Sequence, residues 1–268
     1  MTCASIRTLP RPHRHLAIGA LGLVALAAAA PAAADDEPSV TPYRPSVSTP
    51  AALSAPGWLE LEAGVQHDRG PASARRDSLP YTLKLAWTPD WGIRLGGDAW
   101  VRDTDENGER ISGTGDTSVI AKRRFAIDES RAFGLELGAT MPTGRRGISD
   151  GKASYLVNGI YSADLGRYHT DINLAATRLG AVDAGTSRLQ TLWAASLSKS
   201  VDDRWGWVGE LSGTQQRGAG STSQLLVAAN WNVSKRLTLD AGAARSLRSG
   251  PSQWSFFSGL TVLTTRLF

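Results

Sequence analysis

The sequence predicts an all-β protein, a transmembrane antiparallel up-and-down β-barrel of about 12 strands and of the Gram-negative outer-membrane type. Three observations lead to this prediction. Strand-like segments follow one another from Gly57 to the last residue, short and long connections alternate between them, and aromatic residues gather at the strand ends. Short turns at one rim and longer loops at the other are typical of outer-membrane barrels.

Residues 1–34 are predicted to be a cleaved signal peptide. Arg7, Arg11 and Arg14 precede the apolar run 16–30, which an A-x-A cleavage pattern follows. Neither this run nor any later one has the ~18 apolar residues that a membrane helix needs. The only cysteine, Cys3, lies in this segment, so we expect no disulfide and no thiolate metal site in the mature chain. No motif in the chain predicts a cofactor.

Cleavage also removes most of the net positive charge. It leaves 26 basic against 25 acidic residues, a formal charge of +1, where the full chain carries +4. A protein that binds nucleic acid retains a basic stripe or patch, and none remains here. We therefore expect no nucleic-acid partner.

Residues 35–56 are predicted to be a Pro-rich periplasmic lead-in to the barrel of residues 57–268. Prolines recur through this segment in a spacing that excludes a helix and favours extended chain, at positions Pro38, Pro42, Pro45, Pro50 and Pro56. The alternative is that residues 35–56 fold back inside the barrel and close its lumen.

The strand-like segments show the alternation of extended chain with one apolar face. In W-L-E-L-E-A-G-V-Q, Leu59 and Leu61 alternate with Glu60 and Glu62. In a membrane barrel the leucines face lipid and the glutamates face the lumen, whereas in a soluble sandwich the apolar side faces a core. The predicted strands span residues 58–67, 78–88, 91–102, 115–126, 131–141, 152–162, 167–178, 188–200, 204–214, 222–232, 236–247 and 253–268.

Connections and aromatic residues both favour the membrane barrel. Short turns around Pro89, Asp128, Asp164, Asp202 and Ser234 alternate with longer loops at 68–77, 103–114, 142–151, 179–187, 215–221 and 248–252. If the short turns are periplasmic, most aromatic residues lie at two levels, as interfacial girdles do. The girdle nearer the turns contains Trp58, Trp87, Trp91, Phe125, Phe133, Tyr161, Tyr168, Trp205, Trp207, Trp231 and Phe268.

Several stretches resemble one known family. They are P-S-V-S-T-P-A-A-L-S-A-P-G-W-L-E-L-E-A-G-V at 45–65, G-T-G-D-T-S-V-I-A-K-R-R-F at 113–125, M-P-T-G at 141–144 and L-T-L-D-A-G at 237–242. The chain resembles the outer-membrane transporter family named for the MetA pathway of phenol degradation. This resemblance implies a β-barrel and passage of aromatic or other hydrophobic compounds. Arg123, where the family carries an aromatic residue, and the ending T-R-L-F depart from its pattern.

The charged residues expected to line the lumen follow from the same alternation. They are Glu60, Glu62, Lys84, Arg94, Asp98, Arg102, Asp116, Lys122, Arg124, Glu136, Asp171, Glu210 and Asp240. We expect Glu62 to meet Lys84, and Asp116 to join Lys122 and Arg124. Opposite charges that pair to hold strand register are the favoured interpretation, and an acidic constriction selective for cations or neutral polar solutes is the alternative.

Small residues are also predicted on the inner face, where they either open space for a solute or permit tight strand coiling. These are Gly92, Gly96, Gly134, Gly138, Gly206 and Gly242.

The stretch D-T-D-E-N-G at 103–108 matches the start of a calcium-binding loop, but Thr114 stands where the closing glutamate belongs. An ordinary acidic loop tip is therefore the favoured interpretation. Catalysis is not expected either, because His67 and His169 fall at opposite ends of the barrel and neither has a Ser or Asp partner at a spacing typical of a nucleophile and its base.

Together these features predict an outer-membrane channel that passes small molecules passively and is not an enzyme. The expected partners are outer-membrane lipid and lipopolysaccharide, the small-molecule solute, and the barrel-assembly machinery through the C-terminal Phe268. The alternative is a structural or ligand-binding barrel with a plugged lumen.

Overall fold

The computed structural model describes residues 38–72, 74–248 and 253–268, all within one compact unit, Pro38–Phe268. The predicted signal peptide, residues 1–34, lies outside the described residues. Within these ranges, no helix is long and apolar enough to cross a membrane.

The described chain is built from antiparallel strands. All twelve predicted strands are present, most within three residues of their expected ends, and one short strand is added. The strands are β1 (Trp58–Arg69), β2 (Arg75–Ala86), β3 (Trp91–Thr104), β4 (Arg110–Gly113), β5 (Thr117–Ala126), β6 (Arg131–Met141), β7 (Ser154–Leu165), β8 (Tyr168–Arg178), β9 (Leu189–Ser200), β10 (Trp205–Gln216), β11 (Gly220–Ser234), β12 (Leu237–Ser246) and β13 (Trp254–Arg266).

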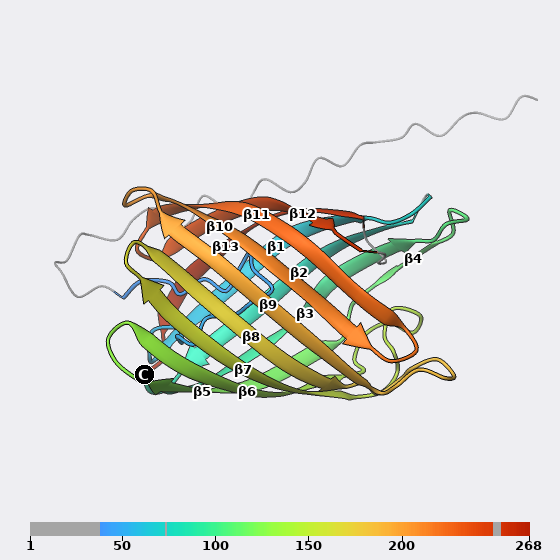
Figure 1. Ribbon diagram of the computed structural model, residues 1–268, viewed down its shortest axis with the longest axis horizontal. Helices are drawn as coiled ribbons and strands as arrows, with labels where there is room; N and C mark the ends of the chain where they lie inside the picture. The colour runs from blue at the N-terminus through green and yellow to red at the C-terminus, as the bar shows by residue number, and fades with distance from the viewer. Residues whose placement is uncertain (1–37, 73, 249–252) are drawn as a thin grey trace, which may run out of the picture. The chain divides into compact units, whose positions relative to one another are not determined.

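The sheet closes into a barrel of twelve strands, because every strand except β4 has a partner on both edges. Each of the twelve barrel strands pairs with the next barrel strand along the chain, β3 with β5 across the added β4, and closure comes from the first and last strands, β1 and β13. Closure leaves no open edge of unpaired backbone groups within the ring of twelve described strands, as a membrane requires. Figure 1 shows the barrel from the side, with short turns at one end, the turn end, and longer loops at the other, the loop end.

Strand β4 corrects the prediction of an irregular loop at 103–114. It pairs with the outer part of β3, with Arg102 opposite Ser112 and Thr104 opposite Arg110. The chain therefore continues beyond the barrel rim as a hairpin, whose turn contains Gly108 at a φ of +85°. Only glycine adopts that conformation without strain.

The distribution of polarity is inverted relative to a soluble protein. The carboxylates of Glu60 and Glu136 are 0 % exposed, whereas Leu137 is 53 % exposed and Leu174 is 66 % exposed. Such an arrangement excludes the soluble sandwich, because a sandwich buries its apolar faces in a core. It is the arrangement of a barrel whose outer face contacts lipid.

Short turns at the turn end are held by acidic side chains. Asp202 accepts hydrogen bonds from the backbone N–H groups of Arg204 and Trp205, at 2.8 and 2.7 Å. Asp128 accepts one from the side chain of Arg131 and one from the N–H of Ser130 at 2.9 Å. Side-chain hydrogen bonds of this kind favour a tight turn over continued strand.

These bonds set the pH range over which the β5–β6 turn is stable. The hydrogen bonds from Arg131 and Ser130 lower the pKa of Asp128 from 3.8 to about 2. Because the pKa of Asp128 is lower in the folded state, its ionised carboxylate stabilises the turn fully above pH 3.8. This stabilisation is lost as the pH falls through about 2. We expect the Ser130 amide resonance of the refolded protein to titrate with a midpoint near 2, and Asp128→Asn to abolish that titration. A midpoint at 3.8 or above would contradict the hydrogen-bonded turn.

Candidate functional site

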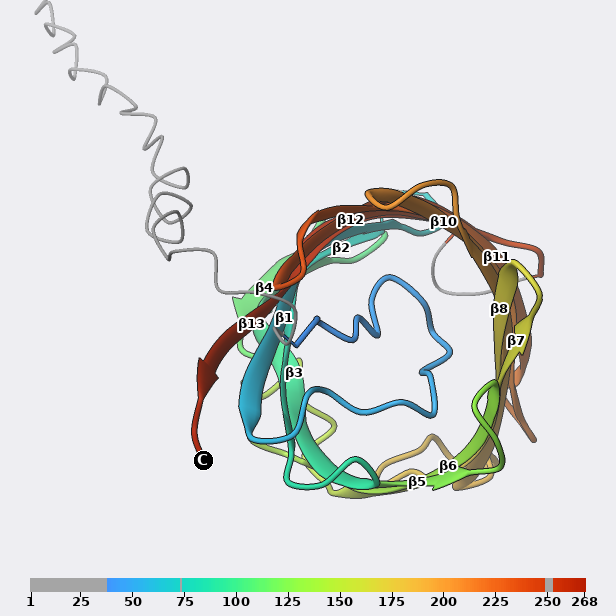
Figure 2. The same cartoon turned by 90° about the vertical axis from the view of Figure 1, so that its left-hand side faces the viewer.

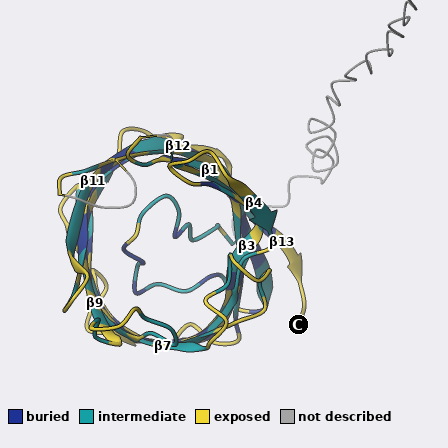
Figure 3. Ribbon diagram, turned by 90° about the vertical axis from the view of Figure 1, so that its right-hand side faces the viewer, coloured by how far each residue is buried: buried dark blue, intermediate teal, exposed yellow. Residues whose placement is uncertain are grey.

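Residues 38–56 lie inside the barrel, and we call this segment the collar. The two end-on views show it within the ring of strands (Figures 2 and 3). The sequence allowed two interpretations of this region, a periplasmic lead-in or a fold back into the lumen. In the structure, residues 38–56 fold back into the lumen. A Pro-rich segment without regular structure cannot satisfy its own backbone N–H groups, so it needs partners from the barrel wall.

The first collar contacts are with two glutamates of β1. Glu60 accepts a hydrogen bond from the N–H of Thr41 at 3.0 Å, and Glu62 accepts one from the N–H of Tyr43 at 2.6 Å. Lys84 lies between the two carboxylates, 2.6 Å from Glu60 and 2.7 Å from Glu62. Its ammonium also donates to the Thr41 carbonyl at 2.6 Å. The expected contact of Glu62 with Lys84 is thus confirmed, and both side chains also hydrogen-bond to the collar.

The collar next contacts β12 and β10. The guanidinium of Arg44 forms an ion pair with Asp240 at 3.2 Å. Glu210 accepts hydrogen bonds from the N–H groups of Val47 at 3.1 Å and Ser48 at 2.8 Å, and from the Ser48 hydroxyl at 2.7 Å. One buried carboxylate therefore satisfies three donors of the collar.

Neutral side chains of β8 and β7 hold the following residues. Asn173 accepts a hydrogen bond from the Thr49 N–H at 3.0 Å and donates to the Thr49 carbonyl at 2.9 Å. The hydroxyl of Ser162 accepts from the Ala51 N–H at 2.7 Å. Asn173 and Ser162 are not among the predicted lumen residues, which are charged side chains and glycines, although both lie at inward positions of the same alternation.

The order of these contacts shows that the collar follows the wall. From Thr41 to Ala51 the partners lie on β1, β12, β10, β8 and β7, which is their order around the barrel. The circuit then reaches β3, where Leu53 lies against Gly92, and β2, where Pro56 bridges to Ala86. The collar therefore makes one turn around the inner face.

The two ends of this circuit are bonded to each other. The Tyr43 hydroxyl donates to the Ala52 carbonyl at 2.8 Å, and the Thr41 hydroxyl donates to the Leu53 carbonyl at 3.1 Å. The buried Tyr43 ring also lies between two ammonium groups, with Lys84 at 3.9 Å and Lys122 at 4.2 Å from its centroid. These cation–π contacts fix the point where the circuit closes.

Glycines on the inner face make room for the collar. A Cβ on Gly64 or Gly259 would lie 2.6 Å from guanidinium atoms of Arg44, and one on Gly134 would lie 3.3 Å from the Cα of Ala51. At Gly92 an added Cβ would overlap the Leu53 side chain. The sequence left two interpretations of the inner glycines, space for a solute or strand curvature. The structure adds a third, because these glycines leave space for the collar itself.

The predicted lumen residues fall into two groups. Glu60, Glu62, Lys84, Lys122, Glu136, Asp171, Glu210 and Asp240 are all buried inside the barrel, and each contacts the collar or a residue that does. Glu136, which touches the Thr49 hydroxyl, pairs with Arg94 at 3.1 Å and Lys122 at 3.5 Å. Arg94 therefore also points inward, and the other four predicted residues lie nearer the rims.

The rim residues are Asp98, Asp116, Arg124 and Arg102, and two of them differ from expectation. Asp98 pairs with Arg76 at 3.0 Å, and Arg124 lies 3.7 Å from Asp90. Asp116 does not join Lys122 and Arg124 as expected, because its carboxylate accepts the N–H of Gly144 at 2.9 Å.

Arg102 is not on the inner face. It pairs with Asp77 at 2.9 Å and shares a surface hollow with the exposed residues Leu79 and Phe256, while the neighbouring Val101 is 0 % exposed. The cause is a register shift between β2 and β3 at Ser78 and Pro80. Two residues of β3, Ala99 and Trp100, stand against the single Leu79 of β2, and this bulge reverses the alternation of the β3 residues beyond it.

The acidic stretch 103–108 is a hairpin turn in which the carboxylates have separate partners. Asp103 pairs with Arg76 at 2.9 Å, and Asp105 accepts the N–H groups of Asn107 and Glu109 at 2.9 and 2.7 Å. Among the residues that the structure describes, no group of three His, Cys, Asp or Glu side chains is arranged to hold a metal ion.

Both histidines of the barrel have Asp partners, of which only the pair of His169 with Asp171, two residues apart on one face of β8, was expected from the sequence. His67 lies 2.5 Å from Asp77, and His169 lies 2.6 Å from Asp164 and 3.2 Å from Asp171. The Ser162 hydroxyl donates to Asp171, not to the imidazole. A nucleophilic serine needs the imidazole as its base, so this order does not form a catalytic triad.

Two cavities adjoin the collar. One, of about 310 Å³, is lined by collar residues including Val40, Pro42 and Ser46, and by His169 and Asp171 of β8. The other, of about 520 Å³, lies on the loop-end side and has Val47 of the collar in its lining. We call the second cavity the vestibule.

Comparison with known proteins supports the fold. No family model matches the chain, and no curated protein sequence matches it. The COG4313 outer membrane channel from Pseudomonas putida F1 has a similar structure, with a TM-score of 0.66 at 14 % identity over 80 % of this chain and 98 % of that chain. The KdgM porin in complex with disordered oligogalacturonate gives 0.53 at 9 % identity, over 76 % and 99 % of the two chains.

The NanC porin gives a TM-score of 0.54 at 9 % identity, over 77 % of this chain and 100 % of that chain. At such identities the likeness shows the fold alone. The class that fold and wall define is a twelve-stranded β-barrel of the outer-membrane type, whose structural neighbours include channels and porins.

The structure predicts that Glu210 holds the middle of the collar. Glu210→Leu would leave the N–H groups of Val47 and Ser48 without an acceptor, and we expect a loss of about 2–4 kcal/mol in unfolding free energy, measured by urea titration in detergent. Protease cleavage within residues 45–50 should increase. Glu210→Gln retains one oxygen acceptor and should show a smaller effect, whereas equal effects would mean that the contact with the collar is not what stabilises this site.

Proposed function

We propose that the protein is a passive channel of the outer membrane for small molecules, with a bore set by the collar. Much of the inner wall is polar and charged, with carboxylates on β1, β6, β8, β10 and β12, as in barrels that hold water. The similarity in fold to the COG4313 channel and to the KdgM and NanC porins supports this class of function. The arrangement of Ser162, Asp171 and His169 gives no support to an enzyme.

The observation that carries the proposal is the path of the collar. Its contacts follow successive strands around the wall, and its two ends are bonded to each other. A segment that follows the circumference narrows a lumen, whereas one that crosses the axis blocks it. Wall carboxylates that bind the collar are unavailable as an acidic selectivity ring, which favours the structural interpretation of the predicted charges.

Two chemical classes of solute are compatible with such a channel. Resemblance to the phenol-degradation family supports aromatic or other hydrophobic compounds. An apolar patch on the inner wall, formed by Val208, Leu226, Ala228, Ala244 and Phe257, is a surface that such a compound would contact. The polar lining of the vestibule instead supports a polar solute.

The same proposal includes export of the chain through a cleaved signal peptide and its assembly into the outer membrane. Cleavage after Ala34 would deliver the chain to the periplasm, and the exposed C-terminal Phe268 would be recognised by the barrel-assembly machinery of a Gram-negative bacterium. The exposed apolar belt would then contact outer-membrane lipid and lipopolysaccharide.

Planar-bilayer conductance of refolded residues 35–268 tests the proposal. We expect discrete conductance steps from the wild-type protein and larger steps after deletion of residues 38–54, because removing the collar widens the lumen. Folding of each variant is checked by its heat-dependent shift on a denaturing gel. Folded wild-type protein without steps, and steps only after the deletion, would instead establish the plugged barrel.

A point variant tests the same idea without disturbing the wall. Ser46 lines the smaller cavity and belongs to the collar, so Ser46→Trp should lower the conductance of each step by reducing the bore. Asn107→Trp, at the tip of the β3–β4 hairpin, is the matched control and should leave conductance unchanged. Equal conductance for both variants would mean that the collar does not set the bore.

A further inference from the structure

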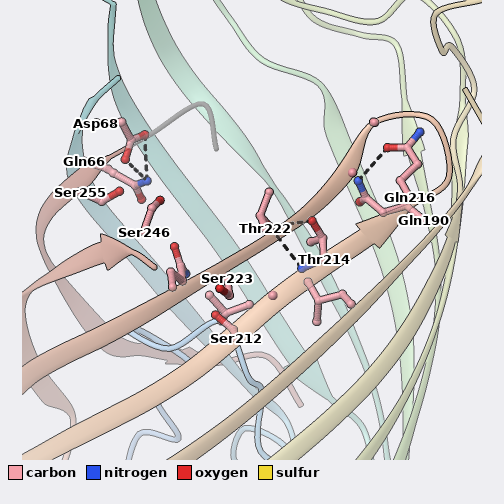
Figure 4. Close-up of a pocket in the computed structure, with 16 residues that line it drawn as sticks. Gln66, Asp68, Gln190, Ser212, Thr214, Gln216, Thr222, Ser223, Ser246 and Ser255 are labelled. Atoms are coloured by element: carbon pink, nitrogen blue, oxygen red, sulfur yellow. Dashed lines mark hydrogen bonds between the residues drawn. The ribbon is translucent and has the colours of Figure 1, made fainter. Parts of the chain in front are cut away.

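The vestibule has the lining of a site for a neutral, polyhydroxylated solute. Most of its lining side chains are amides and hydroxyls, supplied by the loop-end halves of β9 to β13 and by β1 (Figure 4). Among them are Gln66, Gln190, Ser212, Gln216, Gln224 and Ser255. Amides and hydroxyls both donate and accept hydrogen bonds, as sugar hydroxyls do.

The charge of the lining selects among polar solutes. Asp68 is the only ionisable side chain among the residues that line the vestibule, and its carboxylate accepts hydrogen bonds from Gln66 at 3.0 and 3.1 Å. Recognition of a carboxylate or phosphate requires Arg or Lys. The lining contains neither, so an anionic solute such as a uronate does not match this cavity.

Part of the lining is already fixed by internal hydrogen bonds. Gln190 donates to Gln216 at 3.3 Å, Gln216 donates to the Ser187 carbonyl at 2.8 Å, and the hydroxyls of Thr214 and Thr222 are 2.8 Å apart. These bonds hold the wall in one arrangement. A site that is ordered before binding loses less entropy when it binds.

Other groups of the lining remain free for a solute. Across the described ranges of the chain, no protein partner hydrogen-bonds to the side chains of Ser212, Gln224 and Ser255. Gln224 lies opposite Ser212 in the β10–β11 pairing and opposite Ser246 in the β11–β12 pairing, so an amide and a hydroxyl stand side by side on the wall. Ser212 is buried and Gln224 and Ser255 are half-buried, so water or a ligand supplies the partners of these polar groups.

An apolar surface borders these groups. Leu226 and Phe257 belong to the inner patch and stand next to inward-facing Gln224 and Ser255 along their strands. A pyranose ring has an apolar C–H face and a hydroxyl edge, which matches an apolar floor beside polar walls. The volume of about 520 Å³ is within the range of small-molecule sites, roughly 300–1,000 Å³.

We infer that the vestibule binds a neutral mono- or disaccharide before it passes the collar. This inference rests on the proposed channel function and names its solute class. Gln224 is assigned the central hydrogen-bonding role, with Ser212 and Ser255 as further contacts. The cation-free lining and the apolar floor distinguish this site from one for acidic oligosaccharides.

Two measurements on residues 35–268 test the inference. Maltose, galacturonate and phenol are each added to single channels in planar bilayers, and maltose binding to the detergent-solubilised barrel is measured by calorimetry. We expect concentration-dependent block by maltose, weaker block by galacturonate, and calorimetric binding of maltose. Gln224→Leu should weaken binding about threefold to tenfold, the effect of one lost hydrogen bond.

Gln215 provides the matched control, because it is the exposed glutamine next to Gln216 on the outer face of β10. Gln215→Leu should leave block and binding unchanged. Conductance steps without maltose block or binding would overturn the inference and leave the channel standing. Maltose binding without conductance would overturn the channel and leave the site standing, and block by phenol alone would assign the aromatic solute class.

Discussion

The hydrogen bonds between the collar backbone and the polar side chains of the wall are the interaction on which the rest of the structure depends. The collar has no regular structure, so its N–H groups would be left without partners inside the barrel. The wall has buried carboxylates, such as Glu60 and Glu210, that would be equally costly alone. Each satisfies the other, and removal of either leaves buried groups unpaired.

This mutual dependence explains features that look unrelated along the chain. The inner glycines leave space at the points where Arg44, Ala51 and Leu53 approach the wall. Lys84 balances two adjacent glutamates and also holds the collar carbonyl at Thr41. The Tyr43 ring lies between Lys84 and Lys122, so the same residues that neutralise the wall also fix the closing point of the circuit.

Sequence patterns predicted the barrel with little error, because alternation and turn residues are local properties. Leu59 and Glu60 already show which faces of β1 meet lipid and lumen, and the turn at Asp128 is encoded by its own side chain. Arg102 was misplaced for a reason that is not local. The register shift at Ser78 and Pro80 depends on how β2 pairs with β3. It changes the face of the sheet on which every later residue of β3 lies. Asn173 and Ser162 were missed because their importance comes from a partner, the collar, more than a hundred positions away in sequence.

The sequence by itself determined the class of fold, the strands, their two faces and the direction of most charged side chains, with Arg102 as an exception, since each of these depends on residues within a single strand. It also restricted residues 38–56 to extended chain, because proline fixes φ and removes backbone donors. Whether that extended chain lies outside the barrel or around its inner wall was decided only by the tertiary structure. The decision depends on the summed hydrogen bonds to β1, β7, β8, β10 and β12, and closure of the sheet is what brings those strands to face one another across a single lumen.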